Sequence, residues 1–394
     1  MPSSPSLPLI PLIATCVLGL EEILESEVRA LGVAGIAAEK GAVTFAGTWE
    51  DCWRANWRLR TANRVLVELG SWDGPDGPSL AAGARALVAT TAARGSGRNR
   101  RPAIDLAALF HPHHSFAIQA TCTASTIRDT RWAALSVKDG LVDGQRDRWG
   151  RRSSVDRESP DLYLRVRLHR DRATLLLDTS GEPLDRRGYR AVTAAAPVRE
   201  QLAAACVLAS GWDGHGPVVD PMCGSGTLLA EAAWIALGRA PGHLRERWAF
   251  ERLPGFDPVT FEEIRREPLP APGPDVLLVG NDASGEALRA ARANLEQAGV
   301  LDHATLTRGD AFALEPPPGP GLVVVNPPHG ERIGTDTEQW RALGDLFKQR
   351  FKGWKAAVLA GGPDRGKHIG LRPRRRIPVM NGPLEARILL FDLF

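Results

Sequence analysis

Three aspartates stand at the ends of short strand-like segments in the second half of the chain. They are Asp220, Asp282 and Asp310. In that order, the carboxylates could pair with an α-ammonium group, accept from a ribose diol and accept from an adenine amine. Any one of them could simply cap the next helix. Three in series, with Asn326 after a fourth strand, instead predict a binding site.

A glycine turn follows the first of these strands. Gly224 and Gly226 flank Ser225, just before a helical pattern that begins at Thr227. Two glycines so close together let the backbone bend and approach a ligand, and the helix N-terminus presents free N–H groups. The turn lacks the third glycine of the dinucleotide fingerprint and the Gly-Lys-Ser/Thr of a phosphate loop. Neither a pyrophosphate nor a triphosphate is therefore favoured as the ligand.

The elements that must position these residues alternate between strand and helix from about residue 198 onward. This alternation predicts a parallel sheet. Two α+β units precede it, and a stretch rich in Gly, Pro and Asp at 71–79 predicts a turn or linker between them. We therefore expect three parts: an N-terminal region at 1–75, a second unit at 76–185 and the parallel-sheet domain at 186–394.

Basic side chains are concentrated in the middle of the chain. The 394 residues carry a net charge of +3, but residues 85–190 alone hold 20 basic and 12 acidic side chains. This excess predicts a surface for a polyanion, although a solvated arginine-rich surface would have the same composition. The chain has no apolar run of about 18 residues, and its five cysteines form no CxxC pair. We therefore expect a cytoplasmic protein without disulfides, zinc or a membrane span.

Several stretches resemble one known family. "DPMCGSGTLLAEAA", "GND", "RGDA" and "VVVNPPHGERIG" are similar to motifs of class I S-adenosylmethionine-dependent methyltransferases. More narrowly, they resemble the guanosine N2-methyltransferases of rRNA and tRNA that carry a THUMP domain. Upstream, "TIRDTRWAALSVKDGLVDGQRDRWG" and "LHRDRATLLLDTSGEPLDRRGYR" resemble the THUMP domain and the segment that joins it to the catalytic domain. "LRPRRRIPVMNGPLEARILLF" resembles the closing strands, so the similarity covers nearly the whole chain.

The resemblance implies an α/β fold with a Rossmann-like, seven-stranded methyltransferase domain. An α+β region, ferredoxin-like at 1–75 and THUMP at 76–185, would precede it and bind RNA. The implied cofactor is S-adenosylmethionine. The residues expected to bind it are Asp220, Met222, Cys223, Gly224, Gly226, Thr227, Asp282, Ala283, Asp310, Ala311 and Asn326.

The resemblance also implies that the substrate amine is bound by the loop of Asn326, Pro327, Pro328 and His329. Asn326 Oδ1 and the Pro327 carbonyl can each accept one N–H of an exocyclic amine, which aims its lone pair at the methyl group. The two prolines restrict φ and remove backbone donors that would compete. The family usually has an aromatic residue where this chain has His329. We expect the imidazole to stack on a flipped base, with a smaller π face.

Basic residues in the middle block, in the join and near the C-terminus are candidates for contact with the RNA backbone. They are Arg128, Arg131, Lys138, Arg190, Arg374 and Arg375. The histidines of "FHPHH" (110–114) lack cysteine or acidic partners at ligand spacing, so we expect no bound metal. We further expect a monomer that binds rRNA or tRNA and no membrane.

Two other functions stay open on the sequence alone. Amine methyltransferases that act on DNA or on protein glutamine share Asn-Pro-Pro, but they would not be expected to carry the basic block upstream. A non-catalytic RNA-binding or ribosome-assembly factor that keeps the fold would tolerate the departure at His329. The sequence does not distinguish rRNA from tRNA as the substrate.

Overall fold

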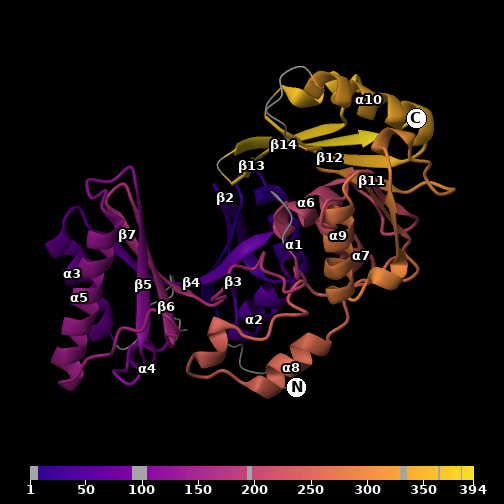
Figure 1. Ribbon diagram of the computed structural model, residues 1–394. Helices are drawn as coiled ribbons and strands as arrows, with labels where there is room; N and C mark the ends of the chain where they lie inside the picture. Colours follow the sequence, from indigo (N-terminus) through magenta and orange to yellow (C-terminus); the bar gives the residue numbers. More distant parts are fainter. Residues whose placement is uncertain (1–7, 91–103, 193–197, 329–334, 363, 383) are drawn as a thin grey trace.

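Two seven-stranded sheets organise the protein, one in each half of the chain (Figure 1). The computed structural model describes residues 8–90, 104–192, 198–328, 335–362, 364–382 and 384–394. The strand order of the first sheet is β2 (Ala34–Glu39), β3 (Ala42–Gly47), β1 (Ile10–Cys16), β4 (Ala62–Asp73), β7 (Arg172–Asp178), β6 (Leu162–His169) and β5 (Phe116–Thr123).

Helices cover one face of this first sheet. Buried and more exposed side chains alternate along β6, as expected when one face of a strand packs against helices. Leu24 and Val28 contribute to the core beneath the ferredoxin-like half, and Ala133 and Val137 to the core beneath the THUMP half. The covering helices are α1 (Glu21–Ala30), α2 (Trp49–Arg58), α3 (Gly77–Ala89), the short α4 (Leu106–Leu109) and α5 (Thr130–Trp149).

The long strand β4 joins the two halves of the first sheet. It pairs with β1 on one side and with β7 on the other, as far as Asp73 opposite Arg172. The prediction of a turn or linker over 71–79 is therefore wrong at both ends of this stretch. Residues 71–73 complete β4, and residues 77–79 begin α3. The reason is a pairing between residues far apart in the chain, which local Gly and Pro content does not reveal. The ferredoxin-like and THUMP regions consequently share one continuous sheet.

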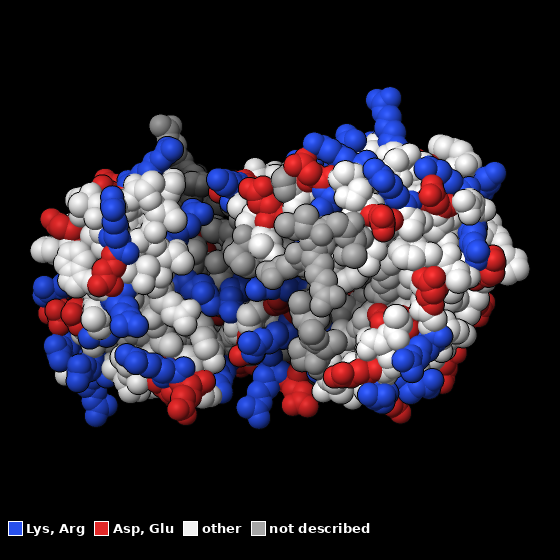
Figure 2. Space-filling view, turned by 45° about the horizontal axis from the view of Figure 1, so that its top comes forward, with Lys and Arg blue, Asp and Glu red and all other residues white. Residues whose placement is uncertain are grey.

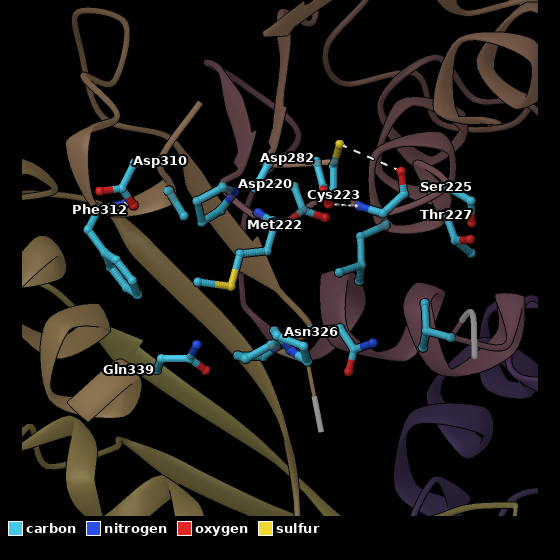
Figure 3. A pocket seen from close by; sticks show the side chains of 18 residues that line it. Asp220, Met222, Cys223, Ser225, Thr227, Asp282, Asp310, Phe312, Asn326 and Gln339 are labelled. Atoms are coloured by element: carbon cyan, nitrogen blue, oxygen red, sulfur yellow. Dashed lines mark hydrogen bonds between the residues drawn. The ribbon is translucent and has the colours of Figure 1, made fainter. Parts of the chain in front are cut away.

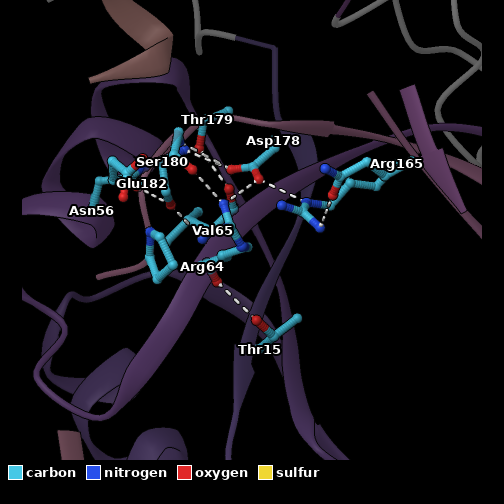
Figure 4. Close-up of polar contacts among 12 residues, drawn as sticks. Thr15, Asn56, Arg64, Val65, Arg165, Asp178, Thr179, Ser180 and Glu182 are labelled. Carbon is cyan, nitrogen blue, oxygen red and sulfur yellow. Dashed lines mark hydrogen bonds and ion pairs between the residues drawn. The ribbon is translucent and has the colours of Figure 1, made fainter. Parts of the chain in front are cut away.

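A buried aspartate at the end of β7 fixes the surrounding strands (Figure 4). Asp178 Oδ2 accepts from Arg64 Nη1 at 2.5 Å and from Arg165 Nε at 2.7 Å. Its other oxygen, Oδ1, accepts from the backbone N–H of Ser180 at 3.0 Å. Ser180 Oγ in turn donates to Asn56 of α2 at 2.6 Å. Residues from β4, β6 and α2 are thereby held at the point where the chain leaves the THUMP region.

The second sheet confirms the expected seven-stranded methyltransferase fold. Its strand order is β10 (Ala304–Arg308), β9 (Leu278–Asp282), β8 (Val218–Asp220), β11 (Leu322–Val325), β12 (Lys355–Gly361), β14 (Leu384–Asp392) and β13 (Arg375–Asn381). The first five strands are parallel, whereas β14 is antiparallel to both β12 and β13. The strand order reverses between β8 and β11, where an open α/β sheet usually forms its ligand crevice.

Helices lie on both faces of the second sheet. Side chains on one face, among them Val218 and Val324, pack in the same core as α6 (Glu200–Ala209), α7 (Thr227–Ala236) and α9 (Gly285–Gln297). On the other face, Val219 and Val323 pack with α10 (Thr335–Arg350) and Ile369 of the 3-10 helix η4 (Arg365–Ile369). Burial on both faces explains why the central strands β8, β11 and β12 are buried almost throughout rather than at alternate residues. Two further 3-10 helices, η2 (Leu301–His303) and η3 (Ala311–Ala313), flank β10.

The segment between β8 and β9 packs the domain of the second sheet against the ferredoxin-like region. It includes η1 (Ala249–Arg252) and α8 (Pro258–Arg266), and α8 packs against α2. Glu267 accepts from Arg54 Nη2 at 2.8 Å and from Arg58 Nη2 at 2.5 Å. The rings of Trp57 and Phe261 meet edge to face with centroids 6.2 Å apart. Within the described residues, no helix has both the length and the apolar character needed to cross a membrane.

Candidate functional site

A cavity of about 490 Å³ lies where the parallel strands of the second sheet end (Figure 3). β8 ends in Asp220 and β9 in Asp282, while Asp310 follows β10 and Asn326 follows β11. Parallel strands end at one edge of a sheet, so residues far apart in the chain meet there. The lining residues that were expected from the sequence are Asp220, Met222, Cys223, Gly224, Thr227, Asp282, Ala283, Asp310, Ala311, Asn326, Pro327 and Pro328.

The glycine turn forms one wall of the cavity. Gly224 and Gly226 have φ values of 52° and 80°, which lie in the left-handed region that favours glycine. The Gly224 N–H donates to Asp282 Oδ2 at 2.9 Å, which ties the turn to the end of β9. Gly226, the N-cap of α7, does not line the cavity itself, and no side chain caps the helix. The turn thus brings backbone N–H groups close to the ligand position.

Asp220 is the most deeply buried acid of the cavity, with 1% of its surface exposed. Its Oδ1 accepts from the Met222 N–H at 3.1 Å, and no basic side chain is among the described residues that line the cavity. Burial raises the pKa of Asp220 to about 8, with a smaller contribution from the negative charge of Asp282. A buried carboxyl group without a cationic partner is suited to a ligand that brings its own positive charge.

Asp282 and Asp310 each accept a local backbone hydrogen bond and also line the cavity. Asp282 Oδ1 accepts from the Ser284 N–H at 2.8 Å, and Asp310 Oδ1 accepts from the Phe312 N–H at 3.0 Å. Both residues also line the cavity. A carboxylate has about four lone-pair positions, so one or two backbone bonds leave acceptor capacity for a ligand. These backbone hydrogen bonds and ligand binding are therefore compatible at both positions.

Asn326 presents an unused acceptor. Its Oδ1 is buried and has no hydrogen-bond partner within the described part of the chain. Leaving such a group unpaired costs about 1–3 kcal/mol. In Figure 3 the Asn326 side chain lies between Gln339 on one side and the glycine turn on the other. This geometry favours a ligand or substrate that donates a hydrogen bond at this point.

Phe312 and Gln339 line the cavity without having been expected there. In Figure 3, Asp310 and Phe312 lie at one end of the cavity, and Ser225 and Thr227 lie at the other. Phe312 follows Asp310 by two residues in "RGDAF", so an aromatic residue near the expected adenine contact was a usable signal. Gln339 comes from α10, far along the chain, and no local pattern indicated it. The other unexpected lining residues are Val198, Pro221, Ser225 and Leu228.

His329 lies outside the described residues, as does the rest of the segment 329–334. Its proposed stacking on a base stays a prediction from the sequence. The described part of the loop, Asn326, Pro327 and Pro328, does line the cavity.

Arg190 occupies a different place from the one expected for an RNA contact. Its Nε donates to Glu200 Oε1 at 2.9 Å, and Nη2 donates to the Val198 carbonyl at 3.1 Å. Longer contacts of 3.4 and 3.3 Å reach Ser225 Oγ and Thr227 Oγ1. Since protein acceptors engage the guanidinium, Arg190 supports the glycine turn, and its contact with RNA stays a proposal.

The THUMP region carries a basic groove between α5 and β5. Arg131 and Lys138 line this groove, as expected from their spacing on one helix, and Arg157 joins them from the loop before β6. Arg128 is exposed just before α5 begins. Figure 2 shows basic side chains over the THUMP lobe, at the left, and along the hollow beside it. Contact of these residues with RNA is a proposal that this placement supports.

Arg374 and Arg375 are partly engaged with the protein. Arg374 Nη2 donates to the Ser210 carbonyl at 3.0 Å, and Arg375 forms an ion pair with Glu22 of α1. Both remain more than two-fifths exposed, so contact with RNA stays a proposal for them. The three histidines of "FHPHH" lie in a loop before β5, and no group of three potential metal ligands occurs among the described residues.

Family models match three parts of the chain. The model described as "RMKL-like, methyltransferase domain" (UPF0020) matches residues 187–389. An "RlmL ferredoxin-like domain" matches residues 11–66, and a "THUMP domain" matches residues 102–178.

Similarity to individual proteins extends over nearly the whole chain. Ribosomal RNA large subunit methyltransferase K/L of Syntrophotalea carbinolica is 37% identical, over 96% of this chain and 53% of the relative. The chain spans about half the length of the curated relatives of this name. A Synechocystis protein named "Putative RNA methyltransferase" is 34% identical, over 98% of this chain and 97% of its own length. A solved structure of "a putative methyltransferase complexed with SAH" has a TM-score of 0.83 at 27% identity, over 98% of this chain and 99% of that one.

Proposed function

Because the chain belongs to the RMKL-like (UPF0020) methyltransferase family, we propose that it transfers a methyl group from S-adenosylmethionine to the N2 amine of a guanosine in RNA. The observation that carries this proposal is the buried Oδ1 of Asn326, which has no hydrogen-bond partner among the described residues and lies in a cavity that Asp220, Asp282 and Asp310 also line. An acceptor held in this way is suited to an amine that donates both of its hydrogens.

The residues of the cavity fit this cofactor. When bound, S-adenosylmethionine supplies an electrophilic methyl group on a positively charged sulfur. Asp220 is placed to pair with the α-ammonium group, Asp282 to accept from the ribose diol and Asp310 to accept from the adenine amine. The ring of Phe312 adds an apolar surface beside Asp310. The absence of basic side chains among the described lining residues favours a cationic ligand over a phosphate-bearing one.

The loop after β11 acts on the amine. Asn326 Oδ1 accepts one N–H and the Pro327 carbonyl accepts the other, so the nitrogen lone pair points away from both acceptors. Pro327 and Pro328 have no backbone N–H that would compete for these oxygens. The residues thus orient a weak nucleophile rather than deprotonate it, and water can take the proton after transfer. The target base must leave its stack to reach this depth.

The upstream region favours RNA over DNA or protein as the substrate. The THUMP match and the basic groove lined by Arg131, Lys138 and Arg157 suit a phosphate backbone. The names of relatives such as the Syntrophotalea protein favour large-subunit ribosomal RNA over transfer RNA within that class. We propose the domain limits 1–75, 76–185 and 186–394 for the three parts that act together.

One experiment separates these possibilities. The protein is incubated with isotope-labelled S-adenosylmethionine and unmodified RNA transcripts, and the digested nucleosides are identified by mass spectrometry. We expect label in N2-methylguanosine. Label only in N6-methyladenosine, in DNA or in protein would overturn the substrate. A calorimetric titration without any cofactor binding would instead favour a non-catalytic RNA-binding factor.

We expect cofactor binding to release protons at low pH and to take up protons at high pH. Since burial raises the pKa of Asp220 to about 8, the carboxyl is mostly protonated at lower pH and must release its proton to pair with an ammonium group. Free α-amino groups have a pKa of about 7.7–8.0. Well above that range Asp220 is ionised, but the ligand amine is neutral and must take up a proton. Calorimetry in buffers of different ionisation enthalpy should show proton release near pH 6.5 and uptake near pH 9.

Cofactor affinity should also fall by up to about tenfold for each pH unit below 8, because each unit adds about 1.4 kcal/mol to the cost of ionising Asp220. The matched control is Asp220→Asn, which keeps the shape of the side chain but has no proton to release. A proton count that does not change with pH in the unaltered protein would contradict the proposed ion pair.

A further inference from the structure

A second, smaller pocket lies beside the cofactor cavity, between η4 and the β13–β14 hairpin. Its volume is about 190 Å³. The side chains of Lys367, Arg376 and Arg387 line it together with Gly362 and Gly366, and no acidic residue is among its described lining. We infer that this pocket binds a backbone phosphate of the RNA strand whose guanosine enters the cavity. This inference rests on the proposed function.

Strand register brings the two arginines together. Arg376 of β13 lies opposite Leu389, and Arg387 of β14 lies opposite Pro378, so both side chains point to the same face of the sheet. Leu389 belongs to the core that packs against α10 and η4. Lys367 reaches the same face from η4. Three cations from three elements therefore converge on one hollow.

The arginines of the segment 372–376 differ in what they contact. Arg375 faces the opposite side of the hairpin from Arg376 and pairs with Glu22 of the ferredoxin-like region. Arg374 donates to the Ser210 carbonyl and lies 3.5 Å from Asp392. Both of these residues hold the hairpin to the rest of the protein. The Arg376 guanidinium therefore remains available to bind a ligand.

The carboxylate of Asp364 compensates the positive charge of the pocket only in part, since it pairs with Lys367 and also acts electrostatically on Arg387. Neither Arg376 nor Arg387 has a hydrogen bond or ion pair within the described residues. Lys367 Nζ lies 2.5 Å from Asp364 Oδ1, but both side chains are 71% exposed, so water screens this pair. Two guanidinium groups that line one pocket offer the planar, multiple donors that bind a phosphate best.

The pocket lies at the catalytic edge of the sheet. Val325, just before Asn326, is opposite Val358 of β12, and Arg387 of β14 is opposite Ala360 of the same strand. Neighbouring strands are about 4.8 Å apart, so two strand spacings place the Arg387 backbone about 10 Å from that of Asn326. This separation suits a phosphate near the flipped nucleotide rather than a remote part of the RNA.

The test compares the double variant Arg376→Gln/Arg387→Gln with Arg292→Gln. Arg292 is an exposed arginine of α9 on the other face of the same sheet. The probe is an unmodified transcript of large-subunit ribosomal RNA, and its affinity is measured over a range of salt concentrations. For one lost phosphate contact we expect the slope of log affinity against log salt to become shallower by about 0.7–0.9. We also expect a KM for RNA about three- to tenfold higher. Arg292→Gln should change neither quantity.

Further comparisons test whether the result is specific to this pocket. Arg387→Lys keeps the charge and should retain the slope, and all variants should match the unaltered protein in unfolding midpoint and cofactor affinity. A double variant whose slope and KM equal those of Arg292→Gln would overturn the inference. If the unaltered protein neither binds the cofactor nor methylates RNA, the proposed function fails. The salt dependence of RNA binding still reports on the pocket in that case.

Discussion

Asn326→Ala is expected to lower the rate of methyl transfer by about 10²–10³-fold, the usual effect of removing one group that is aligned with the transition state. Asn326 Oδ1 is a buried acceptor without a partner in the described chain, so the alanine variant leaves one N–H of the target amine unheld. The nitrogen lone pair then loses its orientation toward the methyl group. A single-turnover assay with saturating cofactor and RNA measures this step directly.

Cofactor binding should change little in Asn326→Ala, because Asp220, Asp282 and Asp310 carry the proposed contacts with S-adenosylmethionine. Calorimetry on the same preparation provides this control, and the unfolding midpoint checks the fold. A turnover within threefold of the unaltered protein would contradict the role of Asn326. A joint loss of turnover and cofactor affinity would indicate that Asn326 shapes the cavity rather than the amine.

Arg187→Met is expected to reduce the free energy of unfolding by about 3–5 kcal/mol, the usual cost of leaving one partner of a buried ion pair alone. Arg187 Nε donates to Glu231 Oε1 at 3.2 Å, and the two residues are 1% and 0% exposed. Arg187 also donates to the carbonyls of Leu184 and Arg60, and Tyr189 donates to the same Glu231 oxygen at 3.0 Å. Equilibrium unfolding in urea measures the loss.

The chain offers a matched control one residue away. Arg186 pairs with Glu182 at 2.5 Å, but these side chains are 71% and 63% exposed. Arg186→Met should therefore change stability by at most about 1 kcal/mol. The double variant Arg187→Met/Glu231→Gln should recover part of the loss, because glutamine removes the unpaired charge and still accepts from Tyr189. Equal effects of the two single variants would refute the distinction between buried and surface pairs.

The groups that Arg187 contacts belong to different parts of the chain. Glu231 lies on α7, the helix that begins at the glycine turn. The Arg60 carbonyl belongs to the ferredoxin-like region. Arg187 comes from the segment that follows the THUMP sheet, so it connects all three parts. Arg190, three residues later, reaches Ser225 and Thr227 at the same turn. The joining segment thus fixes how the RNA-binding region sits relative to the cofactor loop.

Local sequence patterns predicted the parallel sheet, and the resemblance to a methyltransferase family predicted its seven strands. Strand-like segments that alternate with helices predict parallel strands, and such strands end at one edge of their sheet. The structure does bring these three residues and Asn326 into one cavity. The glycines at 224 and 226 were recognisable because their positive φ values demand that residue type. These features depend on residues that are close together in the chain, so they can be recognised from the sequence.

Only the tertiary structure decided which charges are available. Arg190 and Arg376 are both arginines near other basic residues, yet one is held by Glu200 and the other faces an open pocket. Strand pairing turned Arg375 toward Glu22 and Arg376 away from it, and it extended β4 through a stretch whose composition predicted a linker. Gln339 entered the cavity from a distant helix. Pairing, burial and strand register arise from contacts between distant residues, so the type of a side chain cannot by itself show what it contacts.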